Sequence, residues 1–312
     1  MTQRLNLQGM QSVFERNGAI GMGERITLLF TGLAMVVFCP LHLQAADRFA
    51  DGTVSTLPLS EGVFMLTGAA GNIGVSVGVD GTLIIDDRYA PMAGRMEAAP
   101  PALGGERPLI VINTHHHQDH VSSNAEFGRS GVIVAHKNVR ARLLAVQRLP
   151  ASAQPLVTYT DTVTLHFNGE ELSLIHLPEG HTERDTMVWF KNANVLHMGD
   201  QLFNGAFLYI DFNSGGRLDG YIANLRRIIS NMPSDVTVIP GHGPVADIPA
   251  VARCLQVIED TSQLVVRALT AGNDEGEIAE DLARYAAWGQ GFISIERWIA
   301  IIKRDQAQRG SL

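Results

Sequence analysis

One seven-residue segment constrains this chain more than any other: residues 114–120 read Thr-His-His-His-Gln-Asp-His. The segment follows a short apolar run, Leu-Ile-Val-Ile, which predicts a buried strand. Alternate side chains of an extended chain point the same way, so His115, His117 and Asp119 are expected on one side of the strand exit. His120 is expected to face elsewhere. Imidazoles and a carboxylate that converge this closely suit zinc, and two directions of projection favour two adjacent ions.

Composition sets the class of protein. The chain has 312 residues, of which 46% are hydrophobic and 18% charged, enough apolar residues for one large domain of roughly 250 residues. Its formal net charge of -8 is opposite to the basic stripe that nucleic-acid binding needs. We therefore expect no nucleic-acid partner.

The N-terminus has the layout of a secretory signal. Arg25 precedes an unbroken run of apolar and small residues, Ile26–Phe38, and further small residues lead to Ala46. The sequence predicts a signal peptide over residues 1–46, with Met22 as an alternative start. The apolar run is short for a spanning helix, so we expect cleavage and export to the periplasm. An uncleaved membrane anchor is the alternative, and the leader is the only expected membrane contact.

The rest of the chain is predicted to be one domain, residues 47–312, which ends in helices over 249–312. Cys39 falls in the leader, so Cys254 would be the only thiol of the mature chain and no intramolecular disulfide is expected. Strands are predicted at 62–67, 73–79, 82–85, 109–112, 132–135, 162–167, 172–177, 186–190, 194–197 and 236–239. Helices are predicted at 93–98, 121–127, 138–147 and 218–230 and from 249 onward. This order suits an α/β (α+β) fold with two packed sheets and helices outside.

Three later fragments offer further metal ligands. Each is expected in a glycine-rich turn after a strand: Glu-Gly-His-Thr with His181, Met-Gly-Asp with Asp200, and Pro-Gly-His-Gly with His242. Glycine allows the close backbone approach that a crowded metal site requires. Any one of these fragments is typical of an ordinary turn, but the three in order after the histidine run indicate one site.

With these motifs the sequence resembles the metallo-β-lactamase superfamily over about residues 60–245. The resemblance implies a four-layer αββα sandwich with two zinc ions at the sheet edges. It also implies the ligands: His115, His117 and His181 for the first ion, Asp119, His120 and His242 for the second, and Asp200 as a bridge. Outside the ligands, the resemblance implies that Asp86 orients a ligand, and Asp185 is a candidate to support His181 by hydrogen bonding.

The implied chemistry is hydrolysis of a small-molecule substrate with a hydrolysable carbonyl. Two zinc ions about 3.5–4 Å apart can hold a hydroxide near neutral pH, and this hydroxide would attack the carbonyl. Asp119 would bind metal and orient the nucleophile, which makes it the catalytic candidate. No Gly-x-Ser-x-Gly motif is present, so a serine hydrolase has no support. Iron and manganese stay open as alternatives to zinc.

Substrate contacts are expected in the segment after the bridging aspartate. The candidate pocket residues are Asn204, Tyr209, Asp211 and Arg217. The aromatic residues of the last helices are interpreted as packing residues rather than a lid: Trp288, Phe292 and Trp298.

Several reactions fit this site, because one fold hosts many. Hydrolysis of a β-lactam ring, and with it antibiotic resistance, is the leading hypothesis, favoured by the predicted export. A bridging Asp200 is more typical of the thioester-hydrolase and lactonase branches, so a glyoxalase-II-like thioester hydrolase or a lactonase is the first alternative. An iron-dependent oxidoreductase of the persulfide dioxygenase type is the alternative from another class, and a non-catalytic binding protein is the third.

Overall fold

The computed structural model describes residues 53–68 and 70–310. The predicted leader and its alternative start lie outside these residues. Within the described ranges no helix is long and apolar enough to cross a membrane.

The described residues form two β-sheets. The seven-stranded sheet pairs its strands in chain order: β1 (Ser55–Ser60), β2 (Val63–Thr67), β3 (Ile73–Gly78), β4 (Gly81–Ile85), β5 (Ile110–Asn113), β6 (Val132–His136) and β7 (Val157–Tyr159). The five-stranded sheet has the order β12-β11-β10-β9-β8, with β8 (Thr162–Phe167), β9 (Glu170–Leu177), β10 (Asp185–Phe190), β11 (Val195–Phe203) and β12 (Thr237–His242). Strands β4 to β7 run parallel, as do β11 and β12, so the carboxyl ends of each set share one sheet edge.

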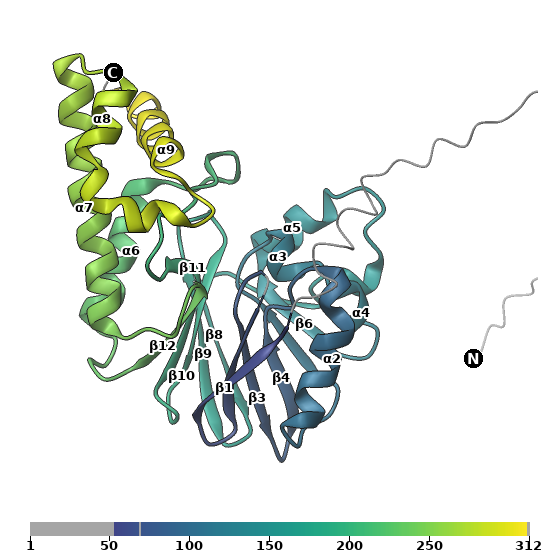
Figure 1. Ribbon diagram of the computed structural model, residues 1–312. Helices are drawn as coiled ribbons and strands as arrows, with labels where there is room; N and C mark the ends of the chain where they lie inside the picture. The colour runs from purple at the N-terminus through teal and green to yellow at the C-terminus, as the bar shows by residue number, and fades with distance from the viewer. Residues whose placement is uncertain (1–52, 69, 311–312) are drawn as a thin grey trace, which may run out of the picture. The chain divides into compact units, whose positions relative to one another are not determined.

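Helices cover the outer faces of both sheets (Figure 1). On the seven-stranded side lie η1 (Ala90–Met92), α2 (Ala93–Ala102), α3 (Gln118–Val121), α4 (Asn124–Phe127), α5 (Lys137–Leu144) and η2 (Ala151–Ala153). On the five-stranded side lie η3 (Phe212–Ser214), α6 (Leu218–Asn231), α7 (Ile248–Ala271), α8 (Glu275–Asp281), η4 (Ala283–Gln290) and α9 (Ile295–Gln308). The expected sandwich of two sheets with helices outside is confirmed.

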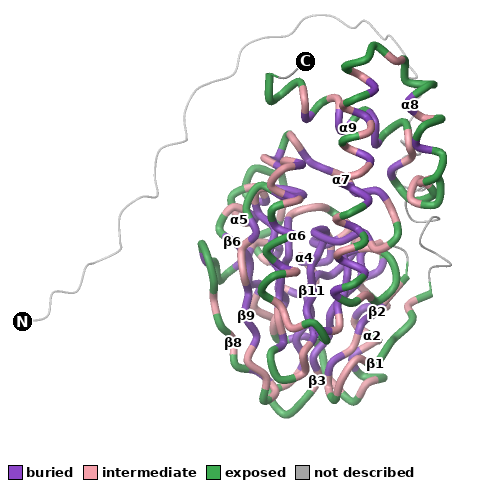
Figure 2. The backbone as a smooth tube through the Cα atoms, turned by 90° about the vertical axis from the view of Figure 1, so that its left-hand side faces the viewer, coloured by how far each residue is buried: buried purple, intermediate pink, exposed green. Residues whose placement is uncertain are grey.

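Apolar residues are buried in layers that match this arrangement. Ile112 of β5 and Leu174 of β9 belong to the cluster between the two sheets. A second cluster packs β11 against the helices of the five-stranded side and includes Leu196, Tyr221 and Trp298. Figure 2 shows β11 buried along its length, and each of its residues is buried. The strand that carries Asp200 is therefore held on both faces.

Local structure differs from the prediction at glycine and proline residues, where the sequence predicts that a strand or helix ends. Strand β11 does not end at His197 but continues to Phe203, so Asp200 lies within a strand rather than in a turn. Gly199 has a φ of 51°, and the pairing register shifts on either side of it, which identifies a β-bulge. Similarly, α2 extends through both prolines of its last turn.

Three further elements depart from the predicted boundaries. The helix expected over 121–127 is two one-turn helices, α3 and α4, separated by Ser122 and Ser123. Strand β12 extends to His242, so this ligand candidate too lies at a strand end rather than in the turn after it. Strands β1 and β7 were not predicted; β7 is only three residues long, and the first four residues of β1 are exposed.

Candidate metal centre

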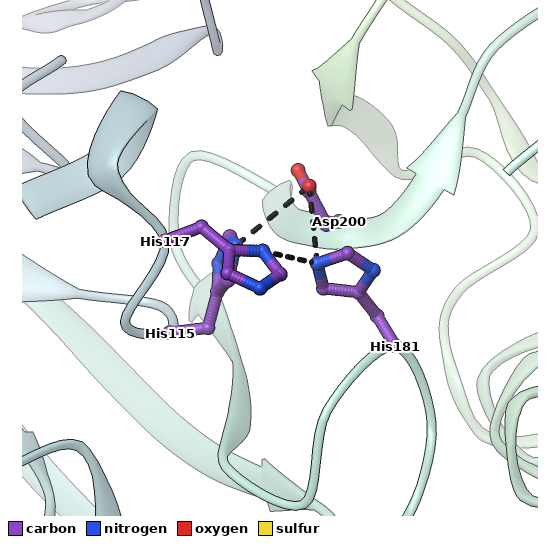
Figure 3. Close-up of side chains that lie close together, drawn as sticks. All are labelled: His115, His117, His181 and Asp200. Carbon is purple, nitrogen blue, oxygen red and sulfur yellow. Dashed lines mark hydrogen bonds and ion pairs between the residues drawn. The ribbon is translucent and has the colours of Figure 1, made fainter. Parts of the chain in front are cut away.

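Three histidines and one aspartate converge at the edge of the sandwich (Figure 3). Their ligating atoms all lie within 4.8 Å of one another. Nδ1 of His117 lies 3.1 Å from Nε2 of His115 and 2.8 Å from Nε2 of His181. Oδ2 of Asp200 lies 3.7 Å and 3.4 Å from the same two Nε2 atoms. These four residues form the first group.

A second group lies beside the first and shares Asp200 with it. It consists of Asp119, His120 and His242, whose ligating atoms also lie within 4.8 Å of one another. Oδ1 of Asp200 is 3.2 Å from Nε2 of His120 and 3.4 Å from Nε2 of His242. Asp200 thus directs one carboxylate oxygen toward each group, which is the geometry of a bridging ligand.

Hydrogen bonds on the outer side of the first group set the tautomers of its histidines. Nδ1 of His181 lies 2.7 Å from the carbonyl oxygen of Tyr209, which can only accept, so this nitrogen carries the proton. Nε2 of His117 lies 3.1 Å from Oδ2 of Asp211 and donates to that carboxylate. In both rings the nitrogen that faces the group therefore presents a lone pair.

Asp86 sets the orientation of two more ligands. It accepts hydrogen bonds from the backbone N and the hydroxyl of Thr114, at 2.8 Å and 2.7 Å, and from Nδ1 of His120 at 2.7 Å. Because the Thr114 hydroxyl donates to Asp86, it accepts from Nδ1 of His115, 3.0 Å away. His115 and His120 therefore also turn lone pairs inward. Asp86 has a φ of 65°, a conformation that aspartate tolerates better than most residues.

The donor set fits divalent cations. In the first group three ring nitrogens face one another at hydrogen-bond distance. Each presents a lone pair and none carries a proton, so they cannot form hydrogen bonds with one another. In the second group, Nε2 of His120 and Oδ1 of Asp200 are buried and lie 3.2 Å apart, but neither atom makes a hydrogen bond. A shared cation in each group would satisfy these atoms, and nitrogen and carboxylate ligands of this number suit zinc.

The electrostatics of the metal-free protein point the same way. Burial alone would lower the pKa of His242, but Asp200 and Asp119 outweigh it and raise that pKa to about 9. Burial alone would also lower the pKa of His120. The carboxylates of Asp200, Asp119 and Asp86 outweigh burial, so this pKa is raised. In the first group, burial lowers the pKa of His181 to about 4 despite Asp200. The second group thus attracts positive charge, and the first group keeps neutral imidazoles.

Two glycines allow the backbone to approach the centre. A Cβ on Gly241 would lie 2.1 Å from Oδ1 of Asp200, and a Cβ on Gly71 would lie 2.6 Å from Cε1 of His120. Both distances are shorter than any real Cβ contact, so a side chain at either position would displace a ligand.

The alternation of an extended chain predicted that Asp119 points the same way as His115 and His117. This prediction is wrong, because Asp119 lies in the second group. The strand ends at Asn113, and α3 begins at Gln118 with His117 as its N-cap. Helical geometry turns Asp119 toward His120 and His242, which explains why the alternation fails after His117.

Of the other predicted residues, Asp185 differs most from expectation. It makes no hydrogen bond to His181 in the described structure. Instead it accepts from the backbone N and the hydroxyl of Thr182 and from Nε2 of Gln201. It therefore stabilises the turn that carries His181 rather than the imidazole ring.

The candidate pocket residues divide into two kinds. Tyr209 and Asp211 contact the first group, through the rings of His117 and His181 and through the bond to His117. Asn204 donates to the carbonyl oxygen of Pro244 and so braces the loop after His242. Arg217 does not present a free charge, because it forms a bidentate pair with Asp219.

Two contributors were not predicted. Thr114 directly precedes the histidine run, and only its contact with Asp86, distant in sequence, reveals its role. Phe292, interpreted from the sequence as a packing residue, is 70% exposed and lies edge-on to Tyr209 with 6.4 Å between ring centroids. No sequence spacing links residues so far apart.

Comparison with known proteins places this geometry in a family. The chain is 25% identical to the acyl-coenzyme A thioesterase MBLAC2 of Bos taurus, over 44% of this chain and 56% of the relative. It is 26% identical to the metallo-beta-lactamase type 2 of Bacteroides fragilis, over 49% of this chain and 58% of the relative. The chain thus spans little more than half the length of these curated relatives.

Solved structures share the fold. A metallo-beta-lactamase from Pontibacter korlensis superposes with a TM-score of 0.58 at 16% identity, over 66% of this chain and 99% of that one. The sequence profile of the metallo-beta-lactamase superfamily matches residues 66–242, which is more than half of the chain. All seven ligand candidates lie within this span. The protein therefore belongs to the metallo-beta-lactamase superfamily, whose members are metal-dependent hydrolases.

Proposed function

We propose that this protein is a binuclear metal-dependent hydrolase of small thioesters and related activated esters such as lactones. The observation that carries the proposal is the position of Asp200, with one oxygen toward each ligand group. A carboxylate shared in this way is the feature that the sequence resemblance associates with the thioester and lactone branches. The similarity to the acyl-coenzyme A thioesterase MBLAC2 supports the same substrate class.

The residues of the chain would divide the work. His115, His117, His181 and Asp200 would hold one ion, and Asp119, His120, His242 and Asp200 the other. Zinc held by these residues would supply a water-derived nucleophile near neutral pH and positive charge for the substrate carbonyl. Asp119 is 21% exposed, so it would orient the attacking water from the open side of the centre.

Hydrolysis of β-lactams is the second candidate. The relative from Bacteroides fragilis supports it, as does the predicted export to the periplasm, where such substrates arrive. Both candidates take a small-molecule substrate with a hydrolysable carbonyl. They differ in the leaving group, a thiolate or alkoxide in one case and an amine in the other.

A hydrolysis panel separates the two candidates. Zinc-loaded protein would be assayed with a thioester, a lactone, nitrocefin and a carbapenem, each with and without chelator. Turnover of the thioester or lactone that chelator abolishes supports the proposal. Chelator-sensitive opening of the lactams alone would move the assignment to the β-lactamases, and metal-independent turnover would refute both.

Asp119→Ala tests the proposed role of this residue. The substitution should abolish turnover while leaving the fold intact, because the side chain is partly exposed and its ion pairs are with the ligand residues His120 and His242. The measurement is kcat on the best substrate of the panel, with circular dichroism as the control for folding. Unchanged turnover would show that Asp119 does not orient the nucleophile.

A further inference from the structure

Aromatic side chains connect the metal centre to the C-terminal helices, which lie outside the span that matches the family. The ring of Tyr209 is half-buried and lies 6.0 Å from that of His117 and 5.9 Å from that of His181, measured between centroids. Phe292 lies 6.4 Å beyond Tyr209 and is 70% exposed. These two rings form a continuous apolar surface that starts at the first ligand group and reaches solvent.

The C-terminal segment is fixed firmly to the loop after β11. The backbone N of Phe207 donates to the carbonyl oxygen of Trp288 at 2.8 Å. The ring of Phe207 stacks on the buried ring of Trp298 at 5.2 Å between centroids. Figure 1 shows α8 and α9 grouped with α7 near the upper end of β11. The position of Phe292 relative to Tyr209 is therefore set by buried packing.

Two arginines extend this surface with positive charge. The guanidinium of Arg297 lies 5.1 Å from the ring centre of Phe292 and donates to the carbonyl oxygen of the same residue. That of Arg304 lies 4.9 Å from the ring centre of Phe212 and donates to Oδ1 of Asn213. Both side chains are exposed.

Neither arginine has a carboxylate partner among the described residues, in contrast to Arg217, which pairs with Asp219. The nearby Asp211 is already committed to His117 and to the backbone N of Asn213. In a chain with a formal net charge of -8, two unpaired arginines beside an exposed aromatic surface make a local site for an anion.

We propose that Tyr209, Phe292, Arg297 and Arg304 form a substrate subsite for an anionic acyl compound. The apolar group next to the scissile carbonyl would lie on Tyr209 and Phe292, and a carboxylate or phosphate at the far end of the substrate would bind Arg297 and Arg304. This inference rests on the proposed hydrolase function and gives its substrate class. It assigns the recognition of substrate charge to Arg297 and Arg304 rather than to Arg217, the candidate pocket residue that pairs with Asp219.

Tyr209 also offers a polar group to this subsite. The Tyr209 hydroxyl makes no hydrogen bond to any described residue, which leaves it available to a ligand.

A matched pair of substrates tests the inference on the zinc-loaded full chain. S-phenyl thiobenzoate and its 4-carboxyphenyl analogue share one scissile bond and differ by one negative charge. In the double variant Arg297→Gln/Arg304→Gln, KM for the charged thioester should rise about tenfold, as expected for the loss of two exposed ionic contacts. Its kcat, and both constants for the neutral thioester, should stay within about twofold of wild type.

A second double variant controls for net charge. Arg227→Gln/Arg253→Gln removes the same charge from exposed positions of α6 and α7 and should leave all four constants unchanged. Phe292→Ser should raise KM for both thioesters, because the apolar surface serves both. Equal effects of the Arg297→Gln/Arg304→Gln substitutions on charged and neutral substrates, or no effect on either, would overturn the inference.

Two further arms identify the source of the anion. Benzoyl-coenzyme A carries phosphates and nitrocefin carries a carboxylate. If the subsite binds a phosphate, the rise in KM caused by Arg297→Gln/Arg304→Gln should be larger for benzoyl-coenzyme A. If it binds a carboxylate, the rise should be larger for nitrocefin. Binding of 4-(benzoylamino)benzoate, an amide analogue, is measured separately by tryptophan fluorescence. If no substrate is hydrolysed but the analogue binds wild type about tenfold more tightly than the Arg297→Gln/Arg304→Gln variant, the proposed function fails and the anion subsite stands. Equal binding would overturn the subsite.

Discussion

At the scale of single residues, the metal centre is determined as much by the partners of the ligands as by the ligands. Each of four ligand histidines makes a hydrogen bond through its outer nitrogen, and this bond fixes which nitrogen faces the centre. The four partners are Asp86, Thr114, Asp211 and the Tyr209 carbonyl. The histidine run alone predicts a metal site but not these tautomers, because the partners come from other parts of the chain. Of the four, only Asp86 was assigned this kind of role from the sequence.

Asp211→Asn should weaken binding of zinc by about 10- to 100-fold, the range typical of partners that orient a ligand. Asp211 uses one oxygen for Nε2 of His117 and the other for the backbone N of Asn213. Asparagine has one acceptor oxygen and no charge, so it can serve only one of these bonds. Competition with a chromogenic chelator measures the affinity, and Asn213→Ala serves as a control for the loop. An affinity equal to wild type would show that Asp211 does not position His117.

Asp200→Ala should remove the second ion before the first. The first group keeps three histidines, and two of them are buried and bonded on their outer side. The second group keeps Asp119, His120 and His242, but the side chains of Asp119 and His242 are 21% and 29% exposed and less constrained. Zinc per chain, measured by mass spectrometry after gel filtration, should fall from about two toward one. Retention of both ions would mean that Asp200 does not bridge, whereas His242→Ala provides a reference for loss of the second site alone.

At the scale of elements, hydrophobic patterning predicted most strands, and it failed where a local signal has two structural meanings. Gly199 reads as a turn, but in the structure it forms a bulge that lets β11 continue and places Asp200 inside the strand. The exposed start of β1 and the brevity of β7 left them without a periodic signal. The seven ligand candidates could be found because each lies in a short recognisable motif. The contribution of the C-terminal helices could not, since it depends on tertiary packing alone.

Helix α9 should depend on one side chain for its attachment. Trp298 is fully buried, stacks on Phe207 and donates from Nε1 to the hydroxyl of Thr261 at 2.9 Å. Trp298→Ala should lower the free energy of unfolding by about 3–5 kcal/mol through the cavity that it leaves. Trp298→Phe keeps most of the packing and should cost about 1 kcal/mol for the lost hydrogen bond. Urea unfolding checks both, with exposed Phe292→Ser as a control; an alanine variant as stable as wild type would contradict the packing argument.

At the scale of the whole domain, the two sheets meet at the metal centre. The seven-stranded sheet leads into His115, His117, Asp119 and His120, and the five-stranded sheet carries or leads into His181, Asp200 and His242. Bound ions would therefore link the sheets at this edge, and metal that binds only the folded chain stabilises it by mass action.

A second contact between the sheets involves titratable groups outside both ligand groups. His136 at the end of β6 stacks on His176 of β9, with 4.0 Å between ring centroids and 5° between planes. Burial, and then the neighbouring His176, lower the pKa of His136 to about 4. Burial also lowers the pKa of His176, against the effects of the Asp185 carbonyl and Asp161. Both rings are therefore neutral in the folded protein at neutral pH.

This pair should make the domain sensitive to acid. The pKa of His136 is lower in the folded chain than its ordinary value of 6.5, so its contribution to stability is complete above pH 6.5 and is lost as pH falls toward 4. The loss should reach about 2 kcal/mol, because a proton must enter a buried site beside a second imidazole.

His136→Asn tests this prediction. It keeps an acceptor for the backbone N of Asn138, the N-cap bond at the start of α5, and should remove this part of the pH dependence. The measurement is the urea midpoint at several values between pH 4 and 7, taken as the difference from wild type because the metal ligands titrate in every variant. His166→Asn on the exposed face of β8 should follow wild type. Parallel curves for His136→Asn and wild type would show that the stacked pair does not link stability to pH.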